Sequence, residues 1–135
     1  MILQVGVKVI IRNDKDEILL LRRTTQYSLP ADTSESWDIP GGRIETGEKL
    51  DAALVREVQE ETGVRLEGSP ALLIAQDIIV PTKDLHVVRL TYVHTQELGD
   101  IKLSDEHNAF KWVPVSDAKR MSIEPFLKAA IESLS

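Results

Sequence analysis

Alternating apolar and polar positions near the start of the chain predict a pair of strands. Residues 5–11 place valine or isoleucine at every second position, which is the period of a strand with one buried face. Residues 18–21 form a short continuous apolar run that fits a buried strand. The polar residues 13–16 between them are typical of a turn, so we expect a hairpin.

Three more segments have strand composition in the second half of the chain. Residues 71–80 and 85–94 are rich in aliphatic side chains, and residues 109–113 follow an acidic, loop-like stretch at 101–108. Both faces of segment 85–94 are largely apolar, which is typical of a sheet that is covered by helices on both sides. The pattern therefore predicts an α/β fold with α/β/α layers.

A helix is predicted in the middle of the chain. Leu50, Ala53, Leu54 and Val58 recur at three- and four-residue spacing, which is the period of one helix face. Gly63 follows at the position where a glycine commonly ends a helix. We therefore expect this helix to end at Gly63.

Shorter signals complete the prediction. Residues 37–39 have strand composition, residues 40–42 contain a proline and two glycines that indicate a sharp turn, and residues 43–45 are expected to form a short strand. Ser116 is expected to cap a short helical turn. Residues 123–134 carry an apolar stripe at helical spacing, which predicts an amphipathic helix that packs on the sheet.

The end of the central helix carries more negative charge than a surface helix favours. At about 100° per residue, Glu57, Glu60 and Glu61 fall within an arc of about 100°. Like charges at these spacings repel, and the helix macrodipole disfavours anions at a C-terminus. A solvated charged face is the alternative interpretation. A hard divalent cation such as Mg²⁺ would turn the repulsion into binding.

Composition narrows the class of protein. The chain has 135 residues, 42% hydrophobic and 28% charged, which fits a single globular domain over residues 1–135. Without cysteine it has no disulfide or thiol nucleophile. The net charge of −6 argues against broad binding of nucleic acid. No long apolar run suggests a leader or a membrane span, so the cytoplasm is the expected location.

The charged helix also belongs to a longer pattern of nine fixed positions. From average residue frequencies, the whole set arises by chance in a chain of this length with a probability on the order of 10⁻⁸. The positions are Gly42, Glu48, Arg56, Glu57, an aliphatic residue at 58, Glu60, Glu61, Gly63 and an aliphatic residue at 64.

This pattern resembles the signature of the Nudix hydrolases at every one of those positions. The first strands, the pair Arg22 and Arg23 and the short length favour the MutT-like branch of that family. The resemblance implies an α/β/α sandwich with a mixed sheet and a loop–helix–loop, and an enzyme that hydrolyses a nucleoside diphosphate linked to another moiety with Mg²⁺ or Mn²⁺. The implied metal ligands are the carbonyl of Gly42 and the carboxylates of Glu57, Glu60 and Glu61. Arg56 is expected to hold a carboxylate in a bidentate grip, so that the ligands are oriented.

Further site residues are expected outside the signature. By the resemblance, Arg23 at the end of the second strand contacts substrate phosphate, and Arg22 is its neighbour. Tyr27 and Trp37 flank a polar loop and are candidates for stacking on a base, although core packing is the alternative for Trp37. Glu106 matches the position of a further metal ligand or general base, and the adjacent Asp105 is the alternative.

The sequence leaves the details of the reaction open. The general base is either Glu57 or Glu106. The expected partner is a small nucleotide, with a nucleoside triphosphate preferred; ADP-ribose or a nucleotide sugar is the alternative, because Pro81 lies one position from the proline typical of that branch. A non-catalytic nucleotide-sensing module is a third hypothesis. Neither nucleic acid nor a membrane is expected as a partner, and the chain is expected to be a monomer or a homodimer.

Overall fold

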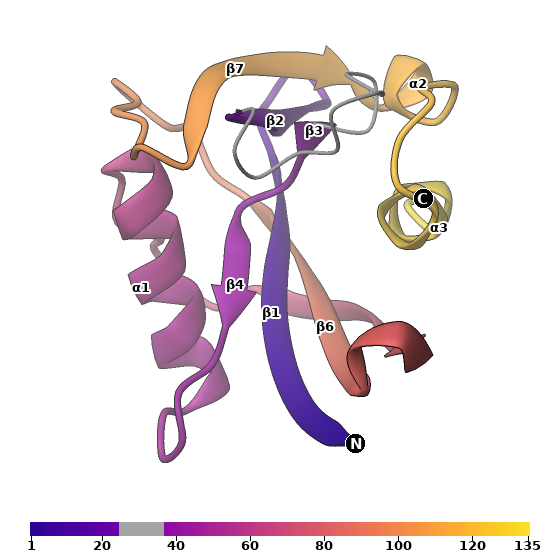
Figure 1. Cartoon of the computed structure of the whole chain (residues 1–135). Helices are drawn as coiled ribbons and strands as arrows, with labels where there is room; N and C mark the ends of the chain where they lie inside the picture. Colours follow the sequence, from indigo (N-terminus) through magenta and orange to yellow (C-terminus); the bar gives the residue numbers. More distant parts are fainter. Residues whose placement is uncertain (25–36) are drawn as a thin grey trace.

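A computed structural model describes residues 1–24 and 37–135 of the chain. Within them a seven-stranded mixed sheet is combined with three helices and a short 3-10 turn (Figure 1). The elements are β1 (Ile2–Arg12), β2 (Glu17–Arg23), β3 (Trp37–Asp38), β4 (Gly41–Arg43), α1 (Leu50–Thr62), β5 (Ala71–Val80), the 3-10 turn η3 (Pro81–Lys83), β6 (Leu85–Thr95), β7 (His107–Pro114), α2 (Val115–Ala118) and α3 (Pro125–Glu132).

Strand β1 lies at the centre of the sheet. It runs parallel to β6 over its whole length and antiparallel to β4. The predicted hairpin forms at its turn, where Arg12 pairs with Ile18, and β2 then continues as the antiparallel partner of β7 and β3. Strand β5 pairs antiparallel with β6. Because the strands diverge after the turn, the sheet opens between β4 and β3, next to residues 38–42.

Helices cover both faces of this sheet, as the apolar segment 85–94 predicted. Figure 1 shows α1 alongside β4 and β1, with α2 and α3 at the opposite side. Alternate residues of β1 and β2 supply two separate cores. The α1 core contains Val7, Val9, Ile11, Leu19, Leu21, Ala53, Leu54, Val58 and Leu66, and the α3 core contains Ile10, Ile18, Leu20, Ile39, Val113, Val115, Ala118, Ile123, Leu127, Ala130, Ile131 and Leu134.

Three local expectations are corrected. The turn expected at residues 40–42 and the strand expected at 43–45 are replaced by β4, because both glycines pair with β1. Ser116 does not cap α2, which begins at Val115 after Pro114 and has no side-chain cap. Helix α3 is shorter than residues 123–134, since the Glu124 side chain caps it and Pro125 opens it.

Helix α1 matches its prediction closely. It begins at Leu50 and ends at Thr62, and Gly63 follows with a left-handed φ of 72°. The Gly63 N–H donates to the Gln59 carbonyl, which satisfies one of the terminal carbonyls. In the part of the chain that the structure describes, no helix has both the length and the hydrophobicity needed to cross a bilayer.

Candidate active site

The three glutamates of α1 differ sharply in exposure. The helix turns its apolar stripe toward the sheet, and Glu61 follows Val58 by three residues on that side. Glu61 is therefore buried, with 4% of its surface exposed. The Glu57 side chain is 13% exposed and the Glu60 side chain 57% exposed. The three carboxylates therefore lie in different environments, from the buried Glu61 to the solvent-exposed Glu60.

Burial makes Glu61 an unusual carboxyl group. Burial, together with the negative charges of Glu57 and Asp38, raises the pKa of Glu61 to about 8. Lys8 and a hydrogen bond of 3.3 Å from the Gly41 N–H oppose this shift. A buried carboxylate beside another carboxylate is the environment in which a divalent cation would replace the proton. The carboxylate oxygens of Glu57 and Glu61 therefore fit a hard divalent cation.

Two glycines bring backbone against these carboxylates. Gly41 has a φ of 148°, and a Cβ on it would lie 2.2 Å from the Val7 carbonyl oxygen. A Cβ on Gly42 would lie 2.6 Å from the Glu57 carboxylate, so that a larger residue could not approach in the same way. The Gly42 backbone and the Glu57 side chain are therefore direct neighbours, as the proposed ligand set requires.

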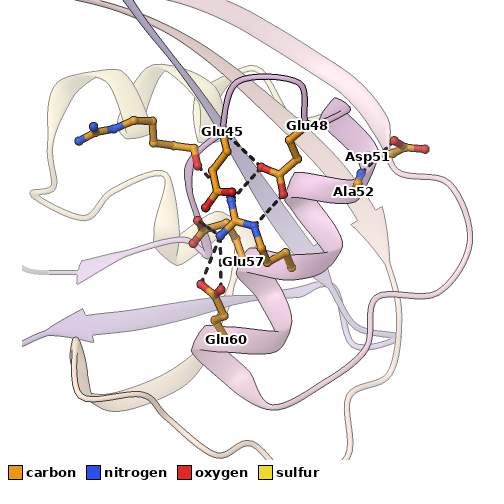
Figure 2. Close-up of polar contacts among 8 residues, drawn as sticks. Glu45, Glu48, Asp51, Ala52, Glu57 and Glu60 are labelled. Atoms are coloured by element: carbon orange, nitrogen blue, oxygen red, sulfur yellow. Dashed lines mark hydrogen bonds and ion pairs between the residues drawn. The ribbon is translucent and has the colours of Figure 1, made fainter.

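Arg56 holds the carboxylates in place from the solvent side. Figure 2 shows Glu48, Glu57 and Glu60 converging on one guanidinium. Arg56 Nε and Nη2 donate to the two oxygens of Glu48 at 2.7 and 2.9 Å, which is a bidentate pair. Arg56 Nη1 donates to Glu57 at 2.9 Å and reaches Glu60 at 3.4 Å. Nη2 also donates to the Arg43 carbonyl at 3.2 Å.

Arg56 therefore makes its expected bidentate contact with Glu48, the signature residue that precedes the helix. The hydrogen bonds from Arg56 lower the pKa of Glu48 to about 2, with help from the backbone near Glu45. In turn, the Glu45 N–H donates to Glu48 at 3.0 Å (Figure 2). Arg56 thus ties the loop before α1 to the helix and fixes the orientation of Glu57.

A small cavity lies at the C-terminal end of α1. It has a volume of 330 Å³ and is lined by Glu60, Glu61, Ser104, Asp105 and Glu106. Glu106, which the sequence assigned to the site, therefore shares a cavity with two of the helix glutamates. Within residues 1–24 and 37–135, no three acidic or histidine side chains lie close enough together to hold a metal ion by themselves.

A larger groove of 1180 Å³ runs along α1, between the helix, residues 65–70 and Tyr92, and Glu48, Arg56 and Glu60 are among the residues that line it. Its lining is mostly apolar, and neither Glu57 nor Glu61 belongs to it. The density of carboxylates, and not the size of the cavity, therefore places the candidate site at the smaller one.

Three of the four predicted substrate residues lie on described strands: Arg22 and Arg23 on β2, and Trp37 on β3. Arg23 Nη1 lies 3.9 Å from Asp38, while Arg22 Nε donates to the Asn108 side chain at 2.8 Å. Trp37 packs against the α3 core, and the Lys111 ammonium lies 4.2 Å from its ring centre. This contact favours the packing interpretation of Trp37. Tyr27 lies outside the described residues.

Two residues near the site, Lys8 and Asp38, were not singled out by sequence reasoning. Lys8 and Asp38 form an ion pair of 2.9 Å, and their side chains are only 15% and 14% exposed. Burial opposes the charge of Asp38, but Lys8 and Arg23 hold its pKa below the usual value. His107 is 8% exposed, and burial lowers its pKa. Lys8 itself could have indicated this ion pair, because a lysine in a strand that is covered on both faces needs an acidic partner for its buried charge.

Comparison with known proteins identifies the family. The family model of the NUDIX domain matches residues 2–134. The chain belongs to the Nudix hydrolase family. The Nudix signature at Gly42–Val64 is therefore a family motif, and the mixed sheet between helices is the expected Nudix fold.

Solved structures with the same fold include MutT proteins. The MutT NUDIX hydrolase from Burkholderia pseudomallei is 27% identical, with a TM-score of 0.82 and full coverage of both chains. The MutT protein from Methanosarcina mazei is 28% identical, with a TM-score of 0.80 over 96% of this chain and 91% of that one.

Similarity to curated relatives is more local. An 8-oxo-dGTP diphosphatase from Escherichia coli is 44% identical over 62 residues, which are 46% of this chain and 44% of the relative. A putative 8-oxo-dGTP diphosphatase from Bacillus subtilis is 43% identical over 58 residues, or 43% of this chain and 34% of the relative. The matched stretch thus spans less than half of the length of these two relatives.

Proposed function

We propose that this Nudix protein is a Mg²⁺-dependent pyrophosphohydrolase that cleaves a nucleoside triphosphate to the monophosphate and pyrophosphate. The observation that carries the proposal is the arrangement of the α1 glutamates: Glu57 lies against the Gly42 backbone, and Glu60 and Glu61 line one cavity. Such a set of oxygen donors suits Mg²⁺ completed by substrate phosphates. All four signature glutamates are present, which argues against a module that only senses nucleotides.

Each residue has a distinct proposed role. Gly42, Glu57, Glu60 and Glu61 would hold the ion, with Mn²⁺ as a possible substitute for Mg²⁺. When bound, the ion would activate a water molecule and neutralise phosphate charge. Arg56 orients Glu57 and Glu60 through the hydrogen bonds described above.

The proton acceptor is assigned to Glu106 in preference to Glu57. Glu57 is engaged by Arg56 at 2.9 Å and is mostly buried, which suits a fixed ligand. Glu106 is exposed at the cavity that Glu60 and Glu61 also line, so that it can accept a proton and pass it to solvent. Arg23, at the end of β2, would receive a phosphate of the substrate.

The names of the curated relatives bear on the substrate class. Two relatives named as 8-oxo-dGTP diphosphatases favour a nucleoside triphosphate, including an oxidised one. The asparagine that members specific for oxidised guanine use before the last helix is missing from residues 119–125. ADP-ribose and nucleotide sugars are the second candidate class, because Pro81 lies close to the position typical of that branch.

The deciding experiment is a panel of substrates assayed with Mg²⁺ and with EDTA. The panel contains canonical and oxidised nucleoside triphosphates, ADP-ribose, nucleotide sugars and dinucleoside polyphosphates, with release of phosphate or pyrophosphate as the signal. We expect metal-dependent release of pyrophosphate from a nucleoside triphosphate. Turnover of ADP-ribose alone would favour the second class, and nucleotide binding without any turnover would favour the sensing module.

A further inference from the structure

The segment that carries Gly42 is held from two sides. On one side, Glu61 accepts a hydrogen bond from the Gly41 N–H, and the Glu57 carboxylate lies against Gly42. On the other side lies Lys8 of β1, which pairs with Gly41 in the sheet. The proposed ligands on α1 and the glycine backbone can therefore keep their relative positions only if the β1 side is also fixed.

Lys8 supplies that fixation through its side chain. A Cβ on Gly41 would lie 2.9 Å from Lys8 Cγ, so the lysine stem crosses directly over this glycine. Beyond it, Lys8 Nζ donates to Asp38 at 2.9 Å and to the Ile39 carbonyl at 3.4 Å. The Asp38 carboxylate also accepts from the Ile39 N–H at 2.8 Å. One ammonium thus connects β1 to the backbone just before the two glycines.

Backbone pairing holds this segment to β1 over a short length only. β4 is three residues long, and the Val9 N–H donates to the Pro40 carbonyl at 3.0 Å. β3 consists of Trp37 and Asp38 and pairs with β2. Because β2 and β1 diverge after Arg12, β3 and β4 belong to different parts of the sheet. The Lys8–Asp38 pair is a side-chain link between β1 and β3 across this opening.

We propose that Lys8 and Asp38 are positioning residues that hold the Gly41–Gly42 backbone at the distance from α1 that metal binding requires. The proposal rests on the proposed function, because it assigns Gly42, Glu57 and Glu61 to the ion. Neither side chain is assigned as a ligand. Loss of the pair is expected to weaken metal binding about 10- to 100-fold, which is the usual effect of losing a partner that orients a ligand.

The test must separate positioning from simple stability. Removing one member of a buried ion pair leaves an uncompensated charge, so Lys8→Met or Asp38→Leu alone is expected to destabilise the fold. Replacing both members by apolar residues of similar volume is often neutral for stability. The variant of choice is therefore the double variant Lys8→Met with Asp38→Leu, and Lys8→Arg serves as the conservative replacement.

Binding of Mn²⁺ without nucleotide is the main measurement, because it excludes any effect of Asp38 on Arg23 and the substrate. We expect the double variant to melt near the wild-type temperature while its Kd for Mn²⁺ rises about 10- to 100-fold. Lys8→Arg should keep most of the affinity. Lys128→Met is the matched control, since this partly buried lysine also makes two hydrogen bonds through its ammonium, to carbonyls at 2.8 and 2.9 Å, but on the α3 side.

The outcomes distinguish the two proposals. If wild-type protein binds no Mn²⁺ and hydrolyses nothing in the panel, the proposed function is wrong, and the positioning role is wrong with it. If the wild type binds Mn²⁺ and a folded double variant binds it equally well, only the positioning role is wrong. A double variant that does not fold would show that the pair is needed for the fold itself, and this would also overturn the proposal.

Discussion

Helices α1 and α3 pack against opposite faces of one sheet, but they follow local stability rules to very different degrees. Helix α3 opens with Pro125, and the Glu124 carboxylate accepts hydrogen bonds from the N–H groups of Phe126 and Leu127. Helix α1 begins after Lys49 without a side-chain cap. It also has no basic residue in its last turn, where its glutamates gather.

The difference indicates that α1 is less stable than its sequence would allow at the position of the candidate active site. In α3 the charged side chain of Glu124 caps the N-terminus of the helix, and the apolar stripe is buried. In α1 the repulsion is concentrated at Glu57, Glu60 and Glu61, and one of these carboxylates is buried. Local rules that fail together at one place are expected at functional sites. The comparison therefore supports the placement of the site at the end of α1.

The largest effect is expected from Glu57→Gln. We expect turnover to fall about 10²- to 10⁴-fold, because the variant loses a proposed ligand of the ion. The fold should persist, since the amide still fits beside Gly42 and one repulsive charge is removed. Pyrophosphate release and thermal melting check this. Glu132→Gln, an exposed glutamate of α3, is the matched control, and equal activity of the two variants would disprove the assignment.

A smaller loss is expected from Arg56→Lys. Lysine keeps the charge but cannot form the bidentate pair with Glu48 while also donating to Glu57. We expect turnover or metal affinity to fall about 10- to 100-fold. Arg120→Lys, at the exposed ion pair with Asp117, should have no effect on either. If both lysine variants behaved alike, the hydrogen bonds of Arg56 would have no role in orienting the site.

Much of this contrast was predictable from sequence. The apolar period and Gly63 predicted the bounds of α1, and two-residue alternation predicted the long strands. These signals depend only on residues that are close together in the sequence. They can therefore be recognised without knowing which other helices or strands the segment packs against. The signature then led to the Nudix family, which the domain match over residues 2–134 confirms.

Non-local pairing accounts for what the sequence did not predict. Proline and glycines at 40–42 are typical of a turn, yet Gly41 and Gly42 pair with β1 across a long stretch of sequence. The Lys8–Asp38 ion pair joins residues that are 30 positions apart, and no periodicity connects them. Burial of Glu61 could have been inferred from its spacing to Val58, but its hydrogen bond to Gly41 depends on β4.

The next prediction concerns the apo protein, in which Glu61→Gln should be stabilising. Burial raises the pKa of Glu61 to about 8, so the folded state binds this proton more tightly than the unfolded state does. Its favourable contribution is complete at pH values below the ordinary glutamate pKa and is lost as pH rises toward 8. The glutamine avoids that loss and can still accept from the Gly41 N–H.

Denaturant unfolding at several pH values measures this effect. We expect the advantage of Glu61→Gln to grow from pH 5 to pH 8 and to reach on the order of 2 kcal/mol. Saturating Mg²⁺ should stabilise wild type more than the variant, which would narrow the difference. A variant that is less stable than wild type at pH 8 without metal would contradict the view that α1 gives up stability for its site.

The smallest effect is expected on the other side of the comparison, from Glu124→Ala. The variant loses the cap of α3 and the partner of Arg89, which lies 3.3 Å away. Loss of a helix cap typically lowers the free energy of unfolding by about 1 kcal/mol. Unlike Glu61→Gln, this change should reduce stability at every pH from 5 to 8, and the Kd for Mn²⁺ should not change. Stabilisation by both substitutions would mean that glutamates are unfavourable throughout this fold, and the contrast between α1 and α3 would lose its functional meaning.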